Sequence, residues 1–381
     1  MDFSRKDTKV VKGFAIVLML YHHLFAFPNR IQGENSYTPL FTFDTADSAM
    51  LVGLFGRVCV ALFLFLGGYG TWMSYRVKTM ASLPDAFKEE EMIKYRYDFL
   101  SCFIIDKIKR LYAPFLKVFI IVVPLAVMLN DPQVQISFTS LFWNATGFNI
   151  SYNGEWWFFT DYVILLAAFP LMVRFFNRKN AAASVDLLVI CIWNGVVTWV
   201  IPSIAQMSWM DGFSESLLWR KLYQTMQWSS CFVVGCLFAR WDLLSRVKEK
   251  LSGRHLACLG ALVLVPFLVC LRFKLNVGYR YDFIFAPAIC IALSMLAATR
   301  AGAFVARPLA AIGRQSTGIW LTHSFFCYHW FQSFIYLPQW SPLVFLLLLG
   351  VSSVFSLFID IFWKIIISFK EMIEIKYHIK L

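Results

Sequence analysis

The sequence predicts an all-α membrane protein, a polytopic bundle of about ten transmembrane helices with both termini in the cytoplasm. Hydrophobic residues make up 59% of the 381 positions and aromatic residues 18%. Charged residues make up only 15%, against about 25% in soluble domains. No polar stretch is long enough to form a separate soluble core. We therefore expect one integral membrane domain over residues 1–381.

Ten apolar stretches have the length that a helix needs to cross the hydrocarbon core, which is about 20 residues. They lie at about residues 12–29, 52–74, 112–130, 156–174, 186–203, 223–240, 255–272, 281–299, 315–336 and 343–368. The first stretch follows a basic start, as in a signal peptide, but it carries Lys12, His22 and His23 and has no small-x-small cleavage site. We expect it to be retained as the first helix.

The positions of the basic residues set the orientation of these helices. With ten spans, 26 Lys and Arg residues lie in the tails and in every second loop, and six lie in the other loops. Because cytoplasmic loops carry the excess of Lys and Arg, this split places both termini in the cytoplasm. The same bias explains the net charge of +12 without a nucleic acid partner. We expect a multi-pass protein of the bacterial plasma membrane, with the lipid bilayer as its surroundings.

The nine cysteines form no C-x-x-C pair and no metal-ligand spacing. Small apolar packing residues are the simplest interpretation of them. We expect no metal cofactor.

The first stretch carries a lysine and a histidine on one helix face. Lys12 and His23 are eleven residues apart, which brings them within about 20° of each other around the helix and about 16 Å apart along it. With Lys12 at the membrane surface, His23 lies near mid-depth. A titratable group there indicates a functional site, although a core histidine bonded to a neighbouring helix is the alternative. A neutral imidazole takes a proton from a hydroxyl at physiological pH.

A basic cluster precedes the third span. Lys107 and Arg110 are three residues apart on one face, and Lys109 adds charge beside them. Such a patch at a membrane mouth suits a phosphate-bearing ligand. Membrane anchoring by positive charge is the alternative.

Polar residues also mark the fourth and ninth spans. Glu155 begins the fourth span beside Trp157, and Asp161 follows inside it, where a carboxylate must be paired or protonated. On the ninth span Ser316 and His323 share a face, and His323 lies about 13 Å from the end marked by Arg314.

Together these segments resemble the acyltransferase family 3 membrane proteins. The family's basic residue, ten residues and His correspond to Lys12 through His23. Its second-helix pattern corresponds to residues 60–69, with Gly67 in place of the usual Ser. Its R-x-x-R corresponds to Lys107-x-x-Arg110, its W-F-[FL] to residues 157–159, and its late S-x-x-[IY]-[YW]-L-x-H to residues 316–323.

This resemblance implies an acyl-CoA-dependent O-acyltransferase that moves an acyl group, usually acetyl, onto a hydroxyl of a cell-surface carbohydrate or glycolipid. Acetyl-CoA then approaches from the cytoplasm, and Lys107, Lys109 and Arg110 hold its nucleotide end. His23 acts as general base on the face that it shares with Lys12, while direct transfer and an acyl-histidine intermediate both remain open. His323 and Ser316 orient the acceptor or stabilise the oxyanion. Glu155, Trp157, Asp161 and Arg57 are the candidate acceptor contacts.

Two other functions fit the same residues, and one of them is a non-catalytic membrane scaffold, which predicts that His23→Ala is tolerated. Intramembrane His, Asp and Arg also suit a proton-coupled transporter or flippase of a sugar or a polyprenyl-linked glycan. The two-half symmetry typical of such carriers is not found in the sequence.

Overall fold

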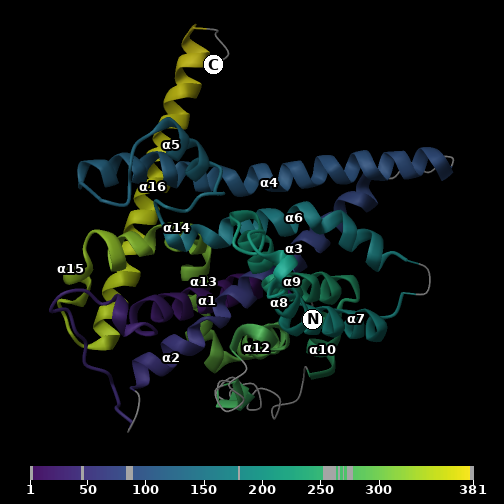
Figure 1. Cartoon of the computed structure of the whole chain (residues 1–381), viewed down its shortest axis with the longest axis horizontal. Coiled ribbons are helices and arrows are strands. Elements are labelled where there is room, and N and C mark those ends of the chain that lie inside the picture. Colours follow the sequence, from purple (N-terminus) through teal and green to yellow (C-terminus); the bar gives the residue numbers. More distant parts are fainter. Residues whose placement is uncertain are drawn as a thin grey trace. The chain divides into compact units, whose positions relative to one another are not determined.

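Helices are the main secondary structure of the part of the chain that the structure describes. The computed structural model describes residues 3–43, 47–82, 89–178, 181–251, 263–264, 267–268, 270–272 and 278–377. Within these ranges the extended pairings are two isolated bridges, Thr38 with Trp340 and Thr42 with Asp47. The prediction of an all-α fold is confirmed (Figure 1).

Five helical segments of the described residues are long and apolar enough to cross a membrane. They are Ser48–Thr79, Asp98–Met128, Gly154–Phe176, Ala183–Ala205 and Ser341–Glu374. A sixth candidate is a pair of helices, Asp282–Ala297 and Gly302–Arg314, bent by 120°. These multiple apolar helices make the chain an integral multi-pass membrane protein.

The remaining predicted spans differ from this set for identifiable reasons. The stretches at 12–29 and 223–240 are helical, but their Lys, Arg, His and Gln side chains leave them too polar to meet the same criteria. The stretch at 315–336 is divided into α14, the π-helix η6 and α15. The stretch at 255–272 lies largely outside the described residues. The count of ten therefore stays a prediction.

The chain forms two compact units, each built from three segments. Unit 1 comprises Met1–Ala15, Arg57–Lys109 and Phe158–Gly313, and unit 2 comprises Ile16–Gly56, Arg110–Trp157 and Arg314–Leu381. Two of the boundaries fall within α1 (Arg5–Phe25) and α4 (Glu89–Met128), so these two long helices contribute to both units.

Unit 1 is organised around α3 (Val58–Ser82) and α9 (Leu217–Arg240), which pack with their backbones in contact. A Cβ atom added at Gly68 would overlap the carbonyl oxygen of Phe232, and one added at Gly235 would overlap that of Phe65. Only glycine permits so close an approach. The other elements with most or all of their residues in this unit are α6 (Trp157–Phe176), α7 (Ala183–Gly195), η3 (Val196–Val200), α8 (Ile201–Ala205), η4 (Ser208–Met210), α10 (Leu243–Leu251), η5 (Gly278–Tyr281), α12 (Asp282–Ala297) and α13 (Arg300–Arg314).

Unit 2 contains the C-terminal part of α1 and the last helices of the chain. Its α14 (Ser316–Ser324) packs on α16 (Ser341–Tyr377), where Gly318 leaves room for the Ser356 side chain. The Trp363 indole of α16 donates to the Lys117 carbonyl of α4, at 3.1 Å. Its other elements are η1 (Pro28–Arg30), α2 (Ser48–Gly56), α5 (Phe138–Ala145), η2 (Gly154–Trp156), η6 (Phe325–His329) and α15 (Gln332–Tyr336).

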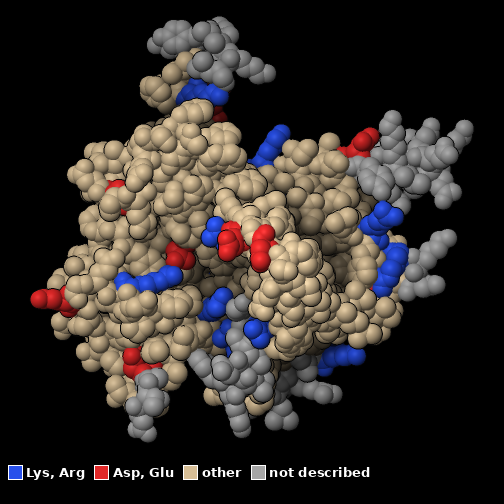
Figure 2. All heavy atoms as spheres, in the orientation of Figure 1, with Lys and Arg blue, Asp and Glu red and all other residues tan. Residues whose placement is uncertain are grey.

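Large apolar side chains are exposed along the candidate spans. Leu171 on α6 and Val354 on α16 are 72% and 67% exposed. The face shown in Figure 2 is mostly uncharged, with few Lys, Arg, Asp and Glu side chains. Helices that face lipid rather than water have this surface.

Candidate active site

The candidate site lies in unit 2, at the C-terminal end of α1. The last carbonyl groups of a helix have no partner within it, so other groups must satisfy them. Here two tyrosines do so: the Tyr328 hydroxyl donates to the His23 carbonyl oxygen and the Tyr336 hydroxyl to that of Leu24, both at 2.6 Å. These bonds fix the last turn of α1, which carries His23.

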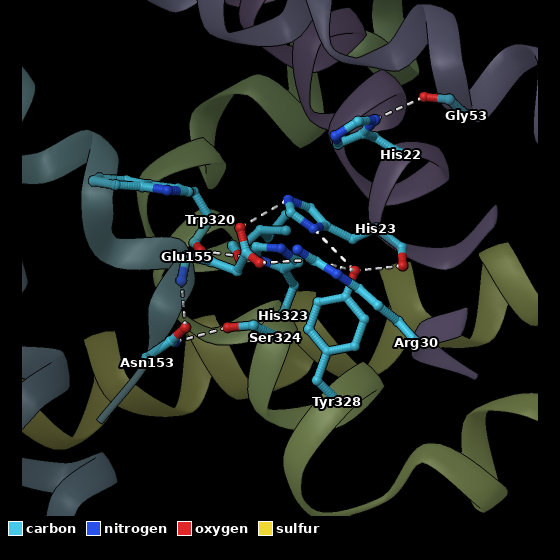
Figure 3. Close-up of polar contacts among 11 residues, drawn as sticks. His22, His23, Arg30, Gly53, Asn153, Glu155, Trp320, His323, Ser324 and Tyr328 are labelled. Atoms are coloured by element: carbon cyan, nitrogen blue, oxygen red, sulfur yellow. Dashed lines mark hydrogen bonds and ion pairs between the residues drawn. The ribbon is translucent and has the colours of Figure 1, made fainter. Parts of the chain in front are cut away.

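The His23 imidazole is surrounded by polar and aromatic groups (Figure 3). Its Nδ1 lies 3.1 Å from the Tyr328 hydroxyl oxygen, and its Nε2 lies 3.6 Å from Oε2 of Glu155. The His323 ring lies 4.8 Å away between ring centroids. The His23 side chain is only 11% exposed. The neighbouring His22 is used differently, because its Nδ1 contacts the Gly53 carbonyl oxygen at 2.8 Å.

Glu155 is positioned by the short segment that begins the third candidate span, Gly154–Phe176. The Asn153 side chain caps η2 by accepting from the Glu155 backbone N–H at 3.0 Å, and it donates to Ser324 Oγ at 2.7 Å. The Trp156 indole donates to the Leu321 carbonyl at 3.0 Å. Asn153 and Trp156 thus fasten this segment to α14, the helix that carries His323.

Arg30 is the basic partner of Glu155. Its guanidinium donates to Oε1 of Glu155 at 3.0 Å and lies over the rings of Phe27 and Tyr328, at 4.7 and 5.2 Å from their centroids. Gln332 donates to the Arg30 carbonyl at 3.0 Å. The ion pair leaves the second carboxylate oxygen of Glu155 as the one that faces His23.

His323 is fully buried, and its hydrogen bonds define its protonation. Its Nδ1 lies 2.8 Å from the Trp320 carbonyl oxygen and 3.2 Å from that of Ile319. Carbonyl oxygens only accept, so Nδ1 must carry a hydrogen. In the neutral ring Nε2 then holds a lone pair, and within the described residues it has no hydrogen-bond partner.

The π-helix η6 carries Tyr328 and is itself anchored to the end of α4. Asp131, which is buried, accepts from the Trp330 indole at 2.9 Å and contacts Nδ1 of His329 at 3.2 Å. A π-helical turn inserts one extra residue into a helix and changes where the following side chains point. Such turns occur frequently at functional sites.

The structure brings three of the predicted site residues together: His23, His323 and Glu155. Three others lie elsewhere in unit 2. Ser316 is buried at the start of α14, Trp157 is half-buried at the start of α6, and Arg110 is exposed on α4.

The other predicted residues belong to unit 1. Lys12 is half-buried on α1, and Lys109 is exposed on α4. Lys107 donates to Ser74 Oγ at 3.1 Å. Arg57 lies over the Trp228 ring at 5.8 Å. Asp161, fully buried, accepts from the Thr225 hydroxyl at 3.1 Å.

Several residues of the site were not identified from the sequence. Arg30 was counted there only as a loop charge, and Tyr328, Asn153 and Trp156 were given no role. Only Asn153 carried a recognisable signal, since Asn before an acidic residue is typical of a helix N-cap. A tyrosine or tryptophan in an apolar segment is common, so its partner is visible only in the fold.

Among the described residues, no three His, Cys, Asp or Glu side chains are arranged to hold a metal ion. The arrangement is instead one of two neighbouring imidazoles, a carboxylate and a guanidinium within an integral membrane protein.

Fold and site together define a membrane protein with a histidine centre suited to proton transfer. A comparison with protein families matched residues 7–361 to the acyltransferase domain of acyltransferase family 3. The chain belongs to this family, and it is therefore an acyltransferase. This match favours the enzyme over the transporter considered from the sequence. A search of curated proteins and a search of solved structures each found no match.

Proposed function

We propose that the protein is a membrane O-acyltransferase that moves an acyl group, most simply acetyl, from cytoplasmic acyl-CoA to a hydroxyl of a cell-surface carbohydrate or glycolipid. The observation that carries the proposal is the surroundings of His23. An imidazole with one nitrogen bonded to Tyr328 and the other facing Glu155 suits a general base.

In the proposed reaction, Nε2 of His23 takes the proton from the acceptor hydroxyl as the hydroxyl oxygen attacks the thioester carbonyl. The tetrahedral intermediate collapses, the carbon–sulfur bond breaks, and the thiolate takes the proton from the imidazolium to give the free thiol of CoA. The Glu155 carboxylate stabilises the imidazolium across 3.6 Å. Arg30 holds Glu155 in place through the ion pair at 3.0 Å. Proton transfer of this kind commonly contributes about 10²–10⁴-fold to the rate.

His323 is proposed to orient the acceptor. With Nδ1 bonded to backbone carbonyls, its Nε2 can accept a hydrogen bond but cannot donate one in the neutral ring. This supports contact with an acceptor hydroxyl over stabilisation of an oxyanion. Ser316 lies two turns before it on α14 and is proposed to support the same contact.

The donor is proposed to bind at the basic cluster of α4. Lys107, Lys109 and Arg110 offer three positive charges within four residues, and Lys109 and Arg110 are exposed. Phosphate groups of CoA would be held there by charge-assisted hydrogen bonds. Arg57, Trp157 and Asp161 remain proposed acceptor contacts.

The topology proposed with this function has ten spans, both termini in the cytoplasm and a location in the bacterial plasma membrane. The asymmetry of Lys and Arg supports it. In this topology Lys12 lies near the cytoplasmic surface, and His23 lies near mid-depth on the same helix.

The direct test is transfer of radiolabelled acetyl from acetyl-CoA in membranes that contain the full chain. We expect label in the polysaccharide or glycolipid fraction, and loss of this transfer in His23→Ala. His22→Gln is the matched control, because it changes the adjacent imidazole whose contact is to a backbone carbonyl. Normal elution of each variant in detergent shows that it still inserts and folds. If His23→Ala transferred acetyl as fast as the unmodified protein, the assignment of His23 as general base would be wrong. Label trapped on the protein would indicate the acyl-histidine route.

A further inference from the structure

The Tyr328 hydroxyl has three polar neighbours within hydrogen-bonding distance. Its oxygen lies 2.6 Å from the His23 carbonyl oxygen, 3.1 Å from Nδ1 of His23 and 3.3 Å from a guanidinium nitrogen of Arg30. A phenol has a single hydrogen to donate and lone pairs with which to accept. Which neighbour receives that hydrogen determines the state of the imidazole.

The single hydrogen lies between the two oxygens. The contact with the His23 carbonyl is the shortest of the three, and two oxygens that close require a hydrogen between them. A carbonyl has none, so Tyr328 is the donor. The Arg30 guanidinium can only donate, so it offers a hydrogen to the phenol oxygen. The remaining contact therefore has Nδ1–H of His23 as donor and the phenol oxygen as acceptor.

From this assignment we infer that Tyr328 is a positioning residue that selects the Nδ1–H tautomer of His23 and leaves the lone pair on Nε2. The nearest Glu155 oxygen lies 3.6 Å from Nε2, which is beyond hydrogen-bonding distance, so it does not require a hydrogen on that nitrogen. Its catalytic consequence rests on the proposed function, in which Nε2 takes the acceptor proton. Tyr328 itself neither gains nor loses a proton in the step, because its hydrogen stays on the phenol oxygen and is donated to the His23 carbonyl. When Nε2 is protonated, Nδ1–H still donates to the phenol oxygen.

The fold holds Tyr328 firmly enough for this role. It lies in η6, whose π-helical geometry is closed by a bond of 2.8 Å from the Trp330 N–H to the Phe325 carbonyl. The next two side chains, His329 and Trp330, contact the buried Asp131. The Arg30 cation lies over the Tyr328 ring itself. These contacts fix Tyr328 beside Nδ1 of His23, away from Nε2, the nitrogen proposed to react.

The chain offers a matched control for the test. Tyr336 donates to the Leu24 carbonyl at 2.6 Å, the same bond that Tyr328 makes one residue earlier. Tyr328→Phe therefore removes a cap of α1, an acceptor of Arg30 and the partner of Nδ1, whereas Tyr336→Phe removes a cap alone. We expect Tyr328→Phe to lower kcat by about 10- to 100-fold with little change in the KM for either substrate, as for loss of an orienting partner of a reactive group. Tyr336→Phe should keep kcat within about threefold, since the loss of one hydrogen bond affects mainly stability.

The tautomer is read directly by ¹⁵N NMR of the full-length protein, labelled at histidine and reconstituted in lipid. The chain has six histidines, so the signals of His23 are assigned by their loss in His23→Gln. We expect a protonated Nδ1 and a bare Nε2 in the unmodified protein, and a mixture of tautomers in Tyr328→Phe. An unchanged tautomer in Tyr328→Phe, or an equal fall of kcat in Tyr336→Phe, would overturn the inference. Full activity in His23→Gln would instead overturn the proposed function. The tautomer assignment would then be decided by the NMR comparison of the unmodified protein with Tyr328→Phe alone.

Discussion

The imidazole rings of His23 and His323 lie 4.8 Å apart, although 300 residues separate them in the chain. One ring is carried by the last turn of α1 and the other by the last turn of α14. In both rings an oxygen acceptor contacts Nδ1: the Tyr328 hydroxyl for His23 and the Trp320 carbonyl for His323. With the tautomer inferred for His23, Nε2 is the unprotonated nitrogen of both neutral rings.

Replacing His323 should weaken the binding of the acceptor more than it lowers kcat. Because its bare Nε2 is proposed to accept from an acceptor hydroxyl, we expect His323→Ala to raise the KM for the acceptor by about tenfold, the effect of losing about one hydrogen bond. The KM for acyl-CoA should stay the same. Initial rates measured over a grid of both substrates separate the two constants. A fall in kcat as large as that of His23→Ala, with the acceptor KM unchanged, would contradict this role.

Removing the charge of Glu155 should slow the proton transfer. Glu155→Gln keeps the shape of the side chain but removes the carboxylate that faces Nε2 of His23 and pairs with Arg30. We expect kcat to fall by about tenfold or more, because one charged partner of the imidazolium is lost. Glu34→Gln is the matched control, since Glu34 is exposed in the same unit. The same loss of kcat in both variants would show that the effect is not specific to the site.

The basic cluster of α4 can be tested through the donor. We expect Lys107→Ala with Arg110→Ala to raise the KM for acyl-CoA by about tenfold or more and to change the acceptor KM less, since two charge-assisted contacts to phosphate are removed. Arg300→Ala with Arg307→Ala removes two exposed arginines of α13 and serves as the control for total charge. An unchanged KM for acyl-CoA in the α4 variant would indicate that the cluster anchors the protein at the membrane surface and does not bind the donor.

Gly67 should tolerate no side chain, in contrast to Gly70 on the same helix. A Cβ atom at Gly67 would lie 2.5 Å from Cε2 of the Tyr162 ring, which packs in turn against Phe158 and Phe232. We expect Gly67→Ala to destabilise the protein by about 1–3 kcal/mol, the usual effect of overpacking. Gly70→Ala should be neutral or stabilising, because no atom lies within 4 Å of its added Cβ. Thermal unfolding in detergent compares the two, and equal Tm values would contradict the prediction.

The position of Gly67 also explains how this chain accommodates a departure from its family's pattern. The sequence shows glycine where the related motif has serine. The structure shows the Tyr162 ring against this position, within unit 1. The missing side chain is thus matched by a large neighbour, which no local pattern in the sequence indicates.

Much of the site was predictable because its chemistry is unusual for an apolar segment. A histidine or a carboxylate in such a segment is rare and costly, so His23, His323 and Glu155 are conspicuous in the sequence. Tyr328 and Trp156 are not, because aromatic residues are common throughout this chain. Arg30 was also inconspicuous, since it follows the end of the first apolar stretch, where a loop charge is ordinary.

The sequence by itself determined the class of the protein, because hydrophobic length, charge asymmetry and the spacing of Lys12 and His23 are local properties of a helix in a bilayer. Only the tertiary structure decided which nitrogen of His23 is bare. That choice depends on the hydrogen bond that the Tyr328 hydroxyl donates to the His23 carbonyl, between two residues 305 positions apart. Hydrogen-bond direction is set by the distances and donor counts of all the neighbours together, and these exist only once α1 and η6 are packed side by side.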